Sequence, residues 1–94
     1  MPRSLNEILN EELQDPEFAR EYNALDLHSQ LAEQVITYRQ NRGLTQSDLA
    51  NIVGTKQSGI SRLENMGSLP SLSFLMRVAE ALDAKVEIKL VGNN

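Results

Sequence analysis

The sequence predicts a mainly α-helical protein: a compact helical bundle that contains a helix-turn-helix, with an N-terminal helical arm and a short C-terminal β-strand. Three observations support this fold class. Apolar residues recur at helical spacing along most of the chain, a glycine-containing turn separates two short helical segments, and only residues 84–91 alternate between apolar and polar side chains. We expect the arm over residues 1–28, the bundle over 29–83, and the strand with a frayed end over 84–94.

The arm is expected to begin with a short amphipathic helix. Ser4 is a suitable N-cap, and Glu7 follows three residues later, as in a capping box. The apolar side chains occupy positions i, i+3, i+4 and i+8 of one helical face: Leu5, Ile8, Leu9 and Leu13. Asp15-Pro16 marks the end of this helix and the start of the next, because proline fits the first turn of a helix.

A longer helical region is expected from Pro16 to about residue 41. Phe18 and Tyr22 continue an apolar stripe, and aromatic residues at helical spacing are expected in the core. The pattern leaves open whether residues 26–29 interrupt this helix. Gly43 is expected to end it as the C′ residue, because glycine adopts the left-handed conformation there without steric cost.

Two short helices are expected next, joined by a turn at Gly54. The first, over residues 46–53, follows the capping-box sequence that starts at Thr45. The second is expected from 56 to about 65, with Thr55 as its N-cap. Their apolar side chains are spaced to pack on one another: Leu49, Ala50, Val53, Ile60 and Leu63. Two helices joined by so short a turn are typical of the helix-turn-helix.

The last helix is expected to begin at Pro70-Ser71, with five residues facing inward: Leu72, Leu75, Val78, Ala79 and Leu82. Beyond it, alternation predicts a strand whose apolar side holds Val86, Ile88 and Leu90. A lone strand leaves its backbone groups without partners. We therefore expect it to pair with the strand of a second copy or with the sheet edge of another protein; the alternative is a disordered tail.

Composition excludes several classes of function. The 94 residues include no cysteine, which excludes disulfides, thiolate zinc sites and cysteine nucleophiles. His28 is the only histidine, so a zinc site has too few ligands. We therefore expect a protein that is not an enzyme and needs neither cofactor nor metal. Without a membrane-spanning apolar run or a secretory signal, a cytoplasmic location without membrane contact is expected.

The charge is divided unevenly along the chain. Residues 1–33 hold two basic and eight acidic residues, a net charge of −6, whereas residues 34–94 hold seven basic and five acidic residues, a net charge of +2. Such asymmetry indicates two partners of opposite electrostatic character, although acidic residues on a helix surface are often merely solvated.

The outward face of the second helix of the motif is rich in hydrogen-bonding side chains: Lys56, Gln57, Ser58, Ser61 and Arg62. Such a face suits the major groove of DNA, where Gln57 can pair with adenine and Arg62 or Lys56 can bind guanine or phosphate. Gln46, at the start of the first helix, is suited to phosphate. Gly59 either allows close approach to DNA or packs against the turn at Gly54.

Residues 31–82 resemble the Cro/C1-type (XRE-like) helix-turn-helix family, in the stretches RGLTQSDLANIVGTKQSGISRLENMGSLPSL and RVAEAL. The resemblance implies a lambda-repressor-like fold, DNA-backbone contacts from Thr45, Gln46 and the loop at Asn65, and a structural ion pair between Arg39 and Glu64. More narrowly, DPEFAREYNAL and DAKVEIKL are similar to HigA-type antitoxins of type II toxin–antitoxin systems. That similarity implies a basic HigB-type toxin that cleaves messenger RNA. A homodimer on operator DNA is expected because one recognition helix covers too few base pairs for tight binding, and such domains usually read two half-sites about 34 Å apart.

The acidic arm is the expected binding site for such a toxin. An apolar face flanked by carboxylates suits a groove lined by cationic residues, and the residues expected there are Leu5, Ile8, Leu9, Glu12 and Leu13. The same apolar stripe could instead pack on the protein's own core. The strand residues Val86, Ile88 and Leu90 are the expected dimer contact.

Three functions are consistent with a helix-turn-helix that carries an acidic arm. The first is an antitoxin that binds DNA, represses its own operon and neutralises a toxin. The second is a phage- or plasmid-type repressor that has no toxin partner. The third, an adaptor whose helix-turn-helix no longer binds DNA, is disfavoured by the polar face of the second helix.

Overall fold

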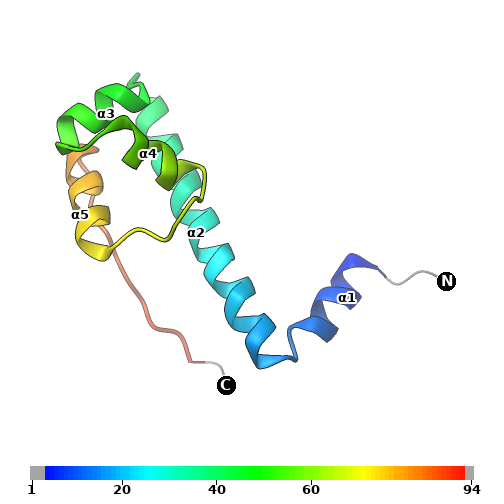
Figure 1. Ribbon diagram of the computed structural model, residues 1–94. Coiled ribbons are helices and arrows are strands. Elements are labelled where there is room, and N and C mark those ends of the chain that lie inside the picture. Colours follow the sequence, from blue (N-terminus) through cyan, green and yellow to red (C-terminus); the bar gives the residue numbers. More distant parts are fainter. Residues whose placement is uncertain (1–3, 93–94) are drawn as a thin grey trace.

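The computed structural model describes residues 4–92, which form five α-helices (Figure 1). Their bounds are α1 Leu5–Glu12, α2 Pro16–Asn41, α3 Gln46–Val53, α4 Gln57–Glu64 and α5 Leu72–Ala81. Helices α3, α4 and α5 gather around the C-terminal half of α2, whereas α1 and the N-terminal half of α2 project away from them (Figure 1). The arm makes the molecule elongated, with principal extents of 50 × 30 × 21 Å.

The helices of the arm begin where local signals predicted. The Ser4 hydroxyl accepts a hydrogen bond of 3.2 Å from the backbone N–H of Glu7, and Asp15 caps α2 with Pro16 in its first turn. Helix α2 then runs through residues 26–29 without a break. At about 1.5 Å per residue, its 26 residues span about 39 Å, which is far longer than the neighbouring helices.

The aromatic residues of α2 lie outside the core, and the prediction that they are core residues was wrong. Phe18 is half-buried and Tyr22 is 38% exposed, and their rings stack on one another with centroids 6.3 Å apart. They remain near the surface because α3, α4 and α5 reach only the C-terminal half of α2.

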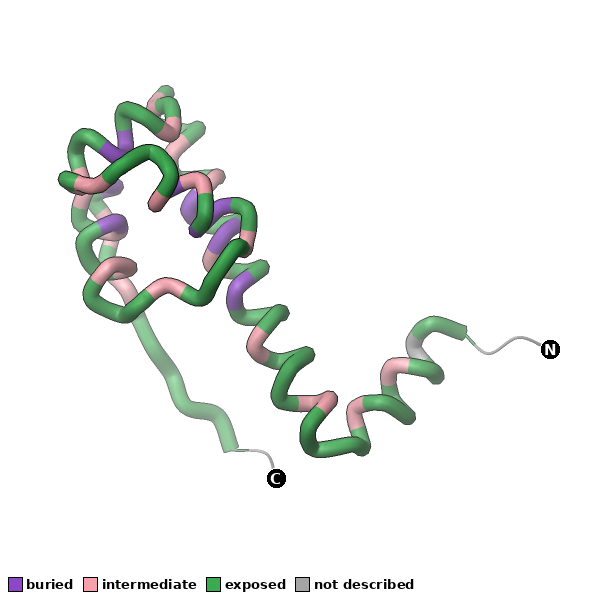
Figure 2. The backbone as a smooth tube through the Cα atoms, in the orientation of Figure 1, coloured by how far each residue is buried: buried purple, intermediate pink, exposed green. Residues whose placement is uncertain are grey.

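The core lies where the C-terminal half of α2 meets α3, α4 and α5 (Figure 2). Its fully buried side chains are Leu49, Ile60, Leu63 and Val78. Each such side chain contributes about 1.5–3 kcal/mol of hydrophobic free energy. Ala50 and Val53 of α3 belong to the same cluster, so the expected packing between the two helices of the motif is confirmed.

His28 is where the buried stripe of α2 begins. The side chain is 3% exposed, and its Nε2 lies 3.3 Å from the Leu63 carbonyl oxygen, which can only accept. The imidazole therefore donates a hydrogen bond from Nε2 and ties α2 to the last turn of α4. This contact gives the single histidine a packing role.

Helix α5 begins at Ser71, whose hydroxyl accepts a hydrogen bond of 3.1 Å from the Phe74 N–H. Val78 and Leu82 face inward as predicted, but Leu72 is 50% exposed. The inward face of the helix therefore begins later than the sequence pattern indicated.

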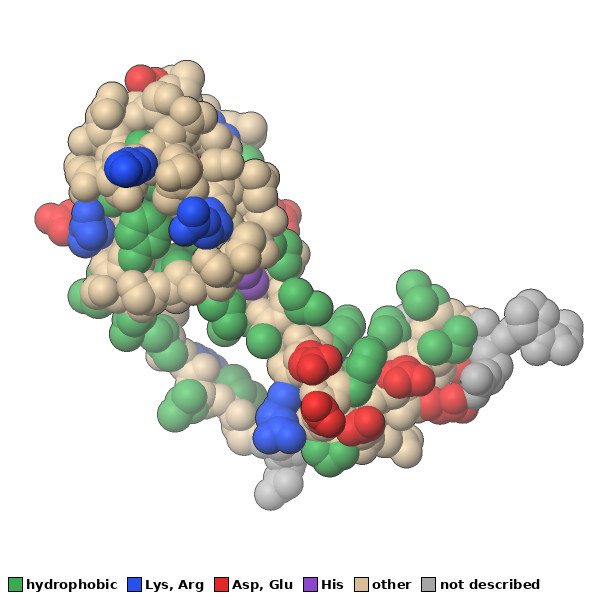
Figure 3. Space-filling view, in the orientation of Figure 1, with side chains coloured by type: hydrophobic (Ala, Val, Ile, Leu, Met, Phe, Trp, Pro, Cys, Tyr) green, Lys and Arg blue, Asp and Glu red, His purple; other side chains and the backbone are tan. Residues whose placement is uncertain are grey.

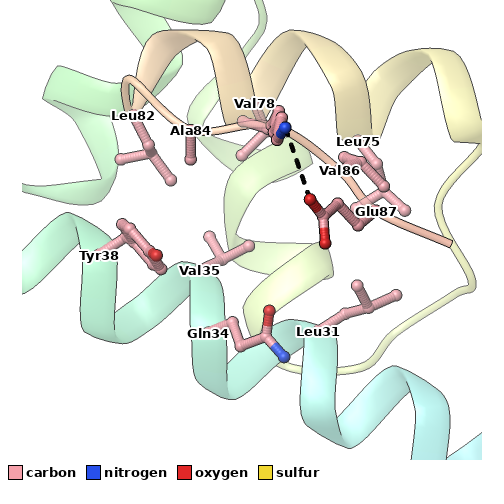
Figure 4. A pocket seen from close by; sticks show the side chains of 12 residues that line it. Leu31, Gln34, Val35, Tyr38, Leu75, Val78, Leu82, Ala84, Val86 and Glu87 are labelled. Atoms are coloured by element: carbon pink, nitrogen blue, oxygen red, sulfur yellow. Dashed lines mark ion pairs between the residues drawn. The ribbon is translucent and has the colours of Figure 1, made fainter.

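The predicted C-terminal β-strand is absent: within residues 4–92 the structure contains helices and no strand. Residues 84–92 run as an extended chain past α5 (Figure 1). Val86 lies near Leu75 at a hollow between α2 and α5 (Figure 4), while Ile88 and Leu90 are 67% and 94% exposed. The strand prediction was wrong, because alternation supplies a side-chain pattern but no second strand to accept the backbone hydrogen bonds. That these three residues contact a second copy of the chain stays a prediction.

Among the helices of residues 4–92, none is both long enough and apolar enough to span a bilayer.

Candidate nucleic-acid interface

Helices α3 and α4 form the helix-turn-helix, and Gly54 makes the turn between them. Its φ of 83° lies in the left-handed region that suits glycine. The backbone N–H groups of Gly54 and Thr55 both donate to the Ala50 carbonyl at 2.9 Å, which ends α3 tightly. Arg77 of α5 closes the turn from outside, because its Nη2 donates to the carbonyls of Val53 at 3.0 Å and Gly54 at 3.4 Å.

The start of α4 differs slightly from the prediction. Lys56 is the N-cap residue in place of Thr55, and its side chain makes no capping hydrogen bond. Gly59 packs inward: a Cβ atom there would lie 3.0 Å from the Thr55 hydroxyl and 3.8 Å from the Phe74 ring. Of the two alternatives for Gly59, the structure therefore supports packing against the turn.

The outward face of α4 is polar and open to solvent. Lys56, Gln57, Ser58 and Arg62 are exposed, and Ser61 is half-buried. Ile60 and Leu63, on the opposite face, are 0% and 2% exposed, so the orientation of α4 is fixed by the core. The side chains expected to contact bases are thus presented together along α4 and at its N-cap.

Thr45 begins α3 with a complete capping box. The Thr45 hydroxyl accepts from the Asp48 N–H at 3.0 Å, and Asp48 accepts from the Thr45 N–H at 2.9 Å. These hydrogen bonds lower the pKa of Asp48 below its ordinary value. The bond to the Thr45 backbone has the larger effect, and the bond to the Thr45 side chain the smaller. The box fixes the first turn of α3, which carries Gln46.

A chain of hydrogen bonds joins the interior to the polar face of α4. Arg39 donates to Glu64 twice, at 2.8 Å from Nε and 2.9 Å from Nη2, and once to the Leu44 carbonyl at 2.9 Å. Gln46 Nε2 donates to Glu64 Oε1 at 3.1 Å, and Gln57 Nε2 donates to Gln46 Oε1 at 3.4 Å. Four side chains from α2, α3 and α4 are therefore connected in one line.

The Arg39–Glu64 pair at the base of this chain is shielded from water. The side chains are 13% and 3% exposed, respectively. The hydrogen bond to Glu64 raises the pKa of Arg39, so the guanidinium remains charged. The pair holds α2 against the end of α4.

The loop after α4 orders two further polar residues. Asn65 Nδ2 donates to the Ser61 hydroxyl at 3.0 Å. The Gly67 N–H donates to the Arg62 carbonyl at 2.9 Å, and a Cβ atom on Gly67 would lie only 2.7 Å from Arg62 Cγ. Gly67 therefore allows the stem of Arg62 to lie against the loop.

Charge separates along the molecule as the sequence indicates. In the view of Figure 3, Lys and Arg side chains gather on the face of the bundle, and Asp and Glu side chains gather over the arm. The residues expected to bind a toxin lie in the arm: Leu5 and Ile8 are 71% and 40% exposed, Glu12 is exposed, and Leu9 and Leu13 are half-buried. Helix α1 lies away from α4 (Figure 1).

Sequence reasoning missed Arg77 and Gly67. Arg77 lies 24 residues from the Val53 carbonyl it binds, and only the docking of α5 on the turn brings the two together. Gly67 stands in a stretch expected to be a loop, where a glycine adds no further signal. The link from Gln46 to Glu64 spans 18 residues and has no local sequence signature either.

A protein-family model described as HTH_3, helix-turn-helix, matches residues 35–88. Antitoxin HigA1 of Mycobacterium tuberculosis (strain H37Rv) is 33% identical over 76 residues, which cover 81% of this chain and 51% of that protein. Antitoxin HipB of Escherichia coli O6:H1 (strain CFT073) is 35% identical over 60 residues, which cover 64% of each chain.

Two solved structures share the fold. A chain of the HipA-HipB-O2-O3 complex has a TM-score of 0.57 and 31% identity, covering 71% of this chain and 92% of that one. An HTH_3 family transcriptional regulator from Vibrio cholerae has a TM-score of 0.59 and 29% identity, covering 62% of this chain and 33% of that one. The chain spans about half the length of the HigA1 antitoxin that it matches.

Proposed function

Because this chain belongs to the HTH_3 helix-turn-helix family, we propose that it is a sequence-specific DNA-binding antitoxin. In this proposal it represses its own operon as a dimer and neutralises a HigB/RelE-type toxin that cleaves messenger RNA. It has no catalytic role, cofactor or metal of its own.

The polar face of α4 is the observation that carries the DNA-binding part of the proposal. An exposed row of amide, hydroxyl and cationic groups on a helix held rigidly by the core matches what the major groove of DNA accepts. In this proposal Gln57 pairs with adenine, Arg62 and Lys56 bind guanine or phosphate, and Ser58 and Ser61 allow close approach. Contacts to the DNA backbone come from Thr45, Gln46 and Asn65.

Dimerisation is proposed from the size of the site. One eight-residue recognition helix reaches only a few base pairs, and helix-turn-helix proteins commonly read two half-sites about 34 Å apart. Two copies on one operator double the number of base contacts, and the specificity for the site rises accordingly.

The antitoxin part of the proposal is supported by the arm and by the relatives. The match to HigA1 covers 76 residues of this chain. The helix-turn-helix family match begins at residue 35, and only 60 residues lie from there to residue 94. At least 16 residues that match HigA1 therefore precede residue 35. Part of that matched stretch lies in the acidic arm over residues 1–28, and the first helix of the arm exposes Leu5 and Ile8. A basic toxin with an apolar groove suits this surface.

The DNA-binding part is tested by substituting Gln57→Ala and Arg62→Ala together. Operators are first selected with the wild-type protein from random duplexes. Two lost bidentate contacts of about 1–3 kcal/mol each predict that affinity at fixed salt falls by at least about thirtyfold. Thermal unfolding should hardly change, because both side chains are exposed. Unaltered affinity in a gel-shift assay would refute this part.

The antitoxin part is tested by co-expression with the products of neighbouring genes. Restored growth and co-purification with a small basic nuclease are the expected results. A chain that binds its operator but rescues no neighbouring product would be a repressor without a toxin partner, the alternative that the similarity to the Vibrio cholerae regulator favours.

A further inference from the structure

We propose that Glu64, although buried, is a positioning residue for base recognition: acting through Gln46, it fixes which way the amide of Gln57 points. The inference rests on the proposed DNA binding and goes beyond it, because it assigns to a core carboxylate a part in the choice of base. It starts from the line of hydrogen bonds that runs from Arg39 to Gln57.

The Glu64 carboxylate acts only as a hydrogen-bond acceptor. Its side chain is 3% exposed, and its two oxygens accept hydrogen bonds from the Arg39 guanidinium, which hold the carboxylate in one orientation. An ionised carboxylate has acceptors and no donor. Any amide that contacts it must therefore present its NH₂ group.

The second step is the orientation of the Gln46 amide. Its Nε2 faces Glu64 Oε1 at 3.1 Å, and a flipped amide would place one acceptor against another. The carbonyl oxygen Oε1 consequently points toward Gln57. That oxygen accepts from Gln57 Nε2 at 3.4 Å, a long hydrogen bond that leaves the end of the side chain able to adjust.

The third step is what Gln57 can still offer to a base. One of its two amide N–H groups is directed at Gln46, which leaves one N–H donor and the carbonyl acceptor for DNA. Adenine requires this combination at its major-groove edge, because N7 accepts and the N6 amino group donates. Guanine presents two acceptors there and would require both N–H groups at once. The fixed orientation of the amides therefore favours adenine over guanine.

The decisive test removes the link and leaves the ion pair in place. The position in a selected operator that Gln57 reads is first identified, as the position whose base preference is lost in Gln57→Ala. Four operators are then made that carry each of the four base pairs at this position. We compare the affinities of wild-type protein, Gln57→Ala and Gln46→Ala for these operators. Wild-type protein should prefer adenine to guanine there by about fivefold or more, the lower end for a bidentate contact. In Gln46→Ala that ratio should fall to within about twofold. Loss of a phosphate contact alone would weaken all four operators equally and leave the ratio unchanged.

Two further variants complete the experiment. Ser47→Ala, an exposed neighbour on the same turn of α3, should keep the wild-type ratio. Glu64→Gln is measured under conditions where its circular dichroism shows a folded protein. It should lose the preference for adenine over guanine as Gln46→Ala does, because a neutral amide at position 64 permits either orientation of the Gln46 amide. If Glu64→Gln does not fold, Gln46→Ala decides by itself.

The outcomes separate the inference from the proposed function. A wild-type adenine ratio in Gln46→Ala would overturn the inference and leave DNA binding intact. A Gln57-dependent preference for a base other than adenine would also overturn it. Unchanged binding of every operator by Gln57→Ala would instead refute the role of α4 in recognition.

Discussion

Breaking the ion pair between Arg39 and Glu64 should remove a large part of the stability of the bundle. Arg39→Met keeps the apolar stem of the side chain but removes two hydrogen bonds to Glu64 and one to the Leu44 carbonyl. The Glu64 side chain, which is 3% exposed, is left with the hydrogen bond from Gln46. Removing one member of a buried pair costs about 3–5 kcal/mol.

That loss is a large part of the free energy of unfolding, which is about 5–15 kcal/mol for an ordinary domain. With a denaturant slope of about 1–3 kcal/mol per molar urea, the midpoint of unfolding should fall by at least about 1 M. The measurement is urea unfolding at neutral pH, followed by far-UV circular dichroism. The slope should stay constant, because the core is otherwise intact.

Two variants control this experiment. Arg42→Met removes the exposed C-cap arginine of the same helix, whose guanidinium carbon lies 5.6 Å from the centre of the Tyr38 ring, and should cost about 1 kcal/mol or less. Replacing both partners, Arg39→Met with Glu64→Leu, should be less damaging than Arg39→Met alone, because no unpaired charge remains buried. A cost below about 1 kcal/mol for Arg39→Met, or a double variant less stable than the single one, would refute the reasoning.

The arm, the capping box at Thr45 and the loop at Gly67 can each be tested by substitution. Leu5→Asp with Ile8→Asp should abolish co-purification of the toxin and leave operator affinity unchanged. Met76→Asp, at an exposed apolar residue of α5, should keep both, and loss of operator binding in the arm variant would contradict the separation of the two surfaces. Asp48→Ala should destabilise the protein at neutral pH. The difference from wild type should shrink as the pH falls through the lowered pKa of Asp48, because protonation removes the negative charge that strengthens its hydrogen bonds to Thr45 in wild type. Urea unfolding across a pH series measures this, and a difference that persists at acid pH would count against it. Gly67→Ala should lower operator affinity by about tenfold at most, as for one weakened base contact, because the added Cβ displaces the stem of Arg62. Gly92→Ala, where the added Cβ meets open space, is the control. Equal operator affinities of the two variants would show that the position of Arg62 does not depend on Gly67.

The sequence by itself determined the features that depend on neighbours within one helical turn. The caps at Ser4 and Asp15-Pro16, the capping box at Thr45 and the turn glycines Gly43 and Gly54 all stand where the pattern predicted them. Each of these signals is a hydrogen bond or a backbone conformation that a short stretch of chain satisfies alone. The polar face of α4 also belongs here, because helical spacing alone separates it from Ile60 and Leu63.

Only the tertiary structure decided features that need a second, distant element. Val86, Ile88 and Leu90 alternate as a strand does, yet no segment of the described chain pairs with them, so the tail is extended without being a strand. Phe18 and Tyr22 have core spacing but lie on the half of α2 that the bundle does not reach. The contact between Gln46 and Glu64 likewise exists only because α3 and α4 fold back on one another. A local pattern states what a side chain needs, and the path of the rest of the chain determines whether a partner is there to supply it.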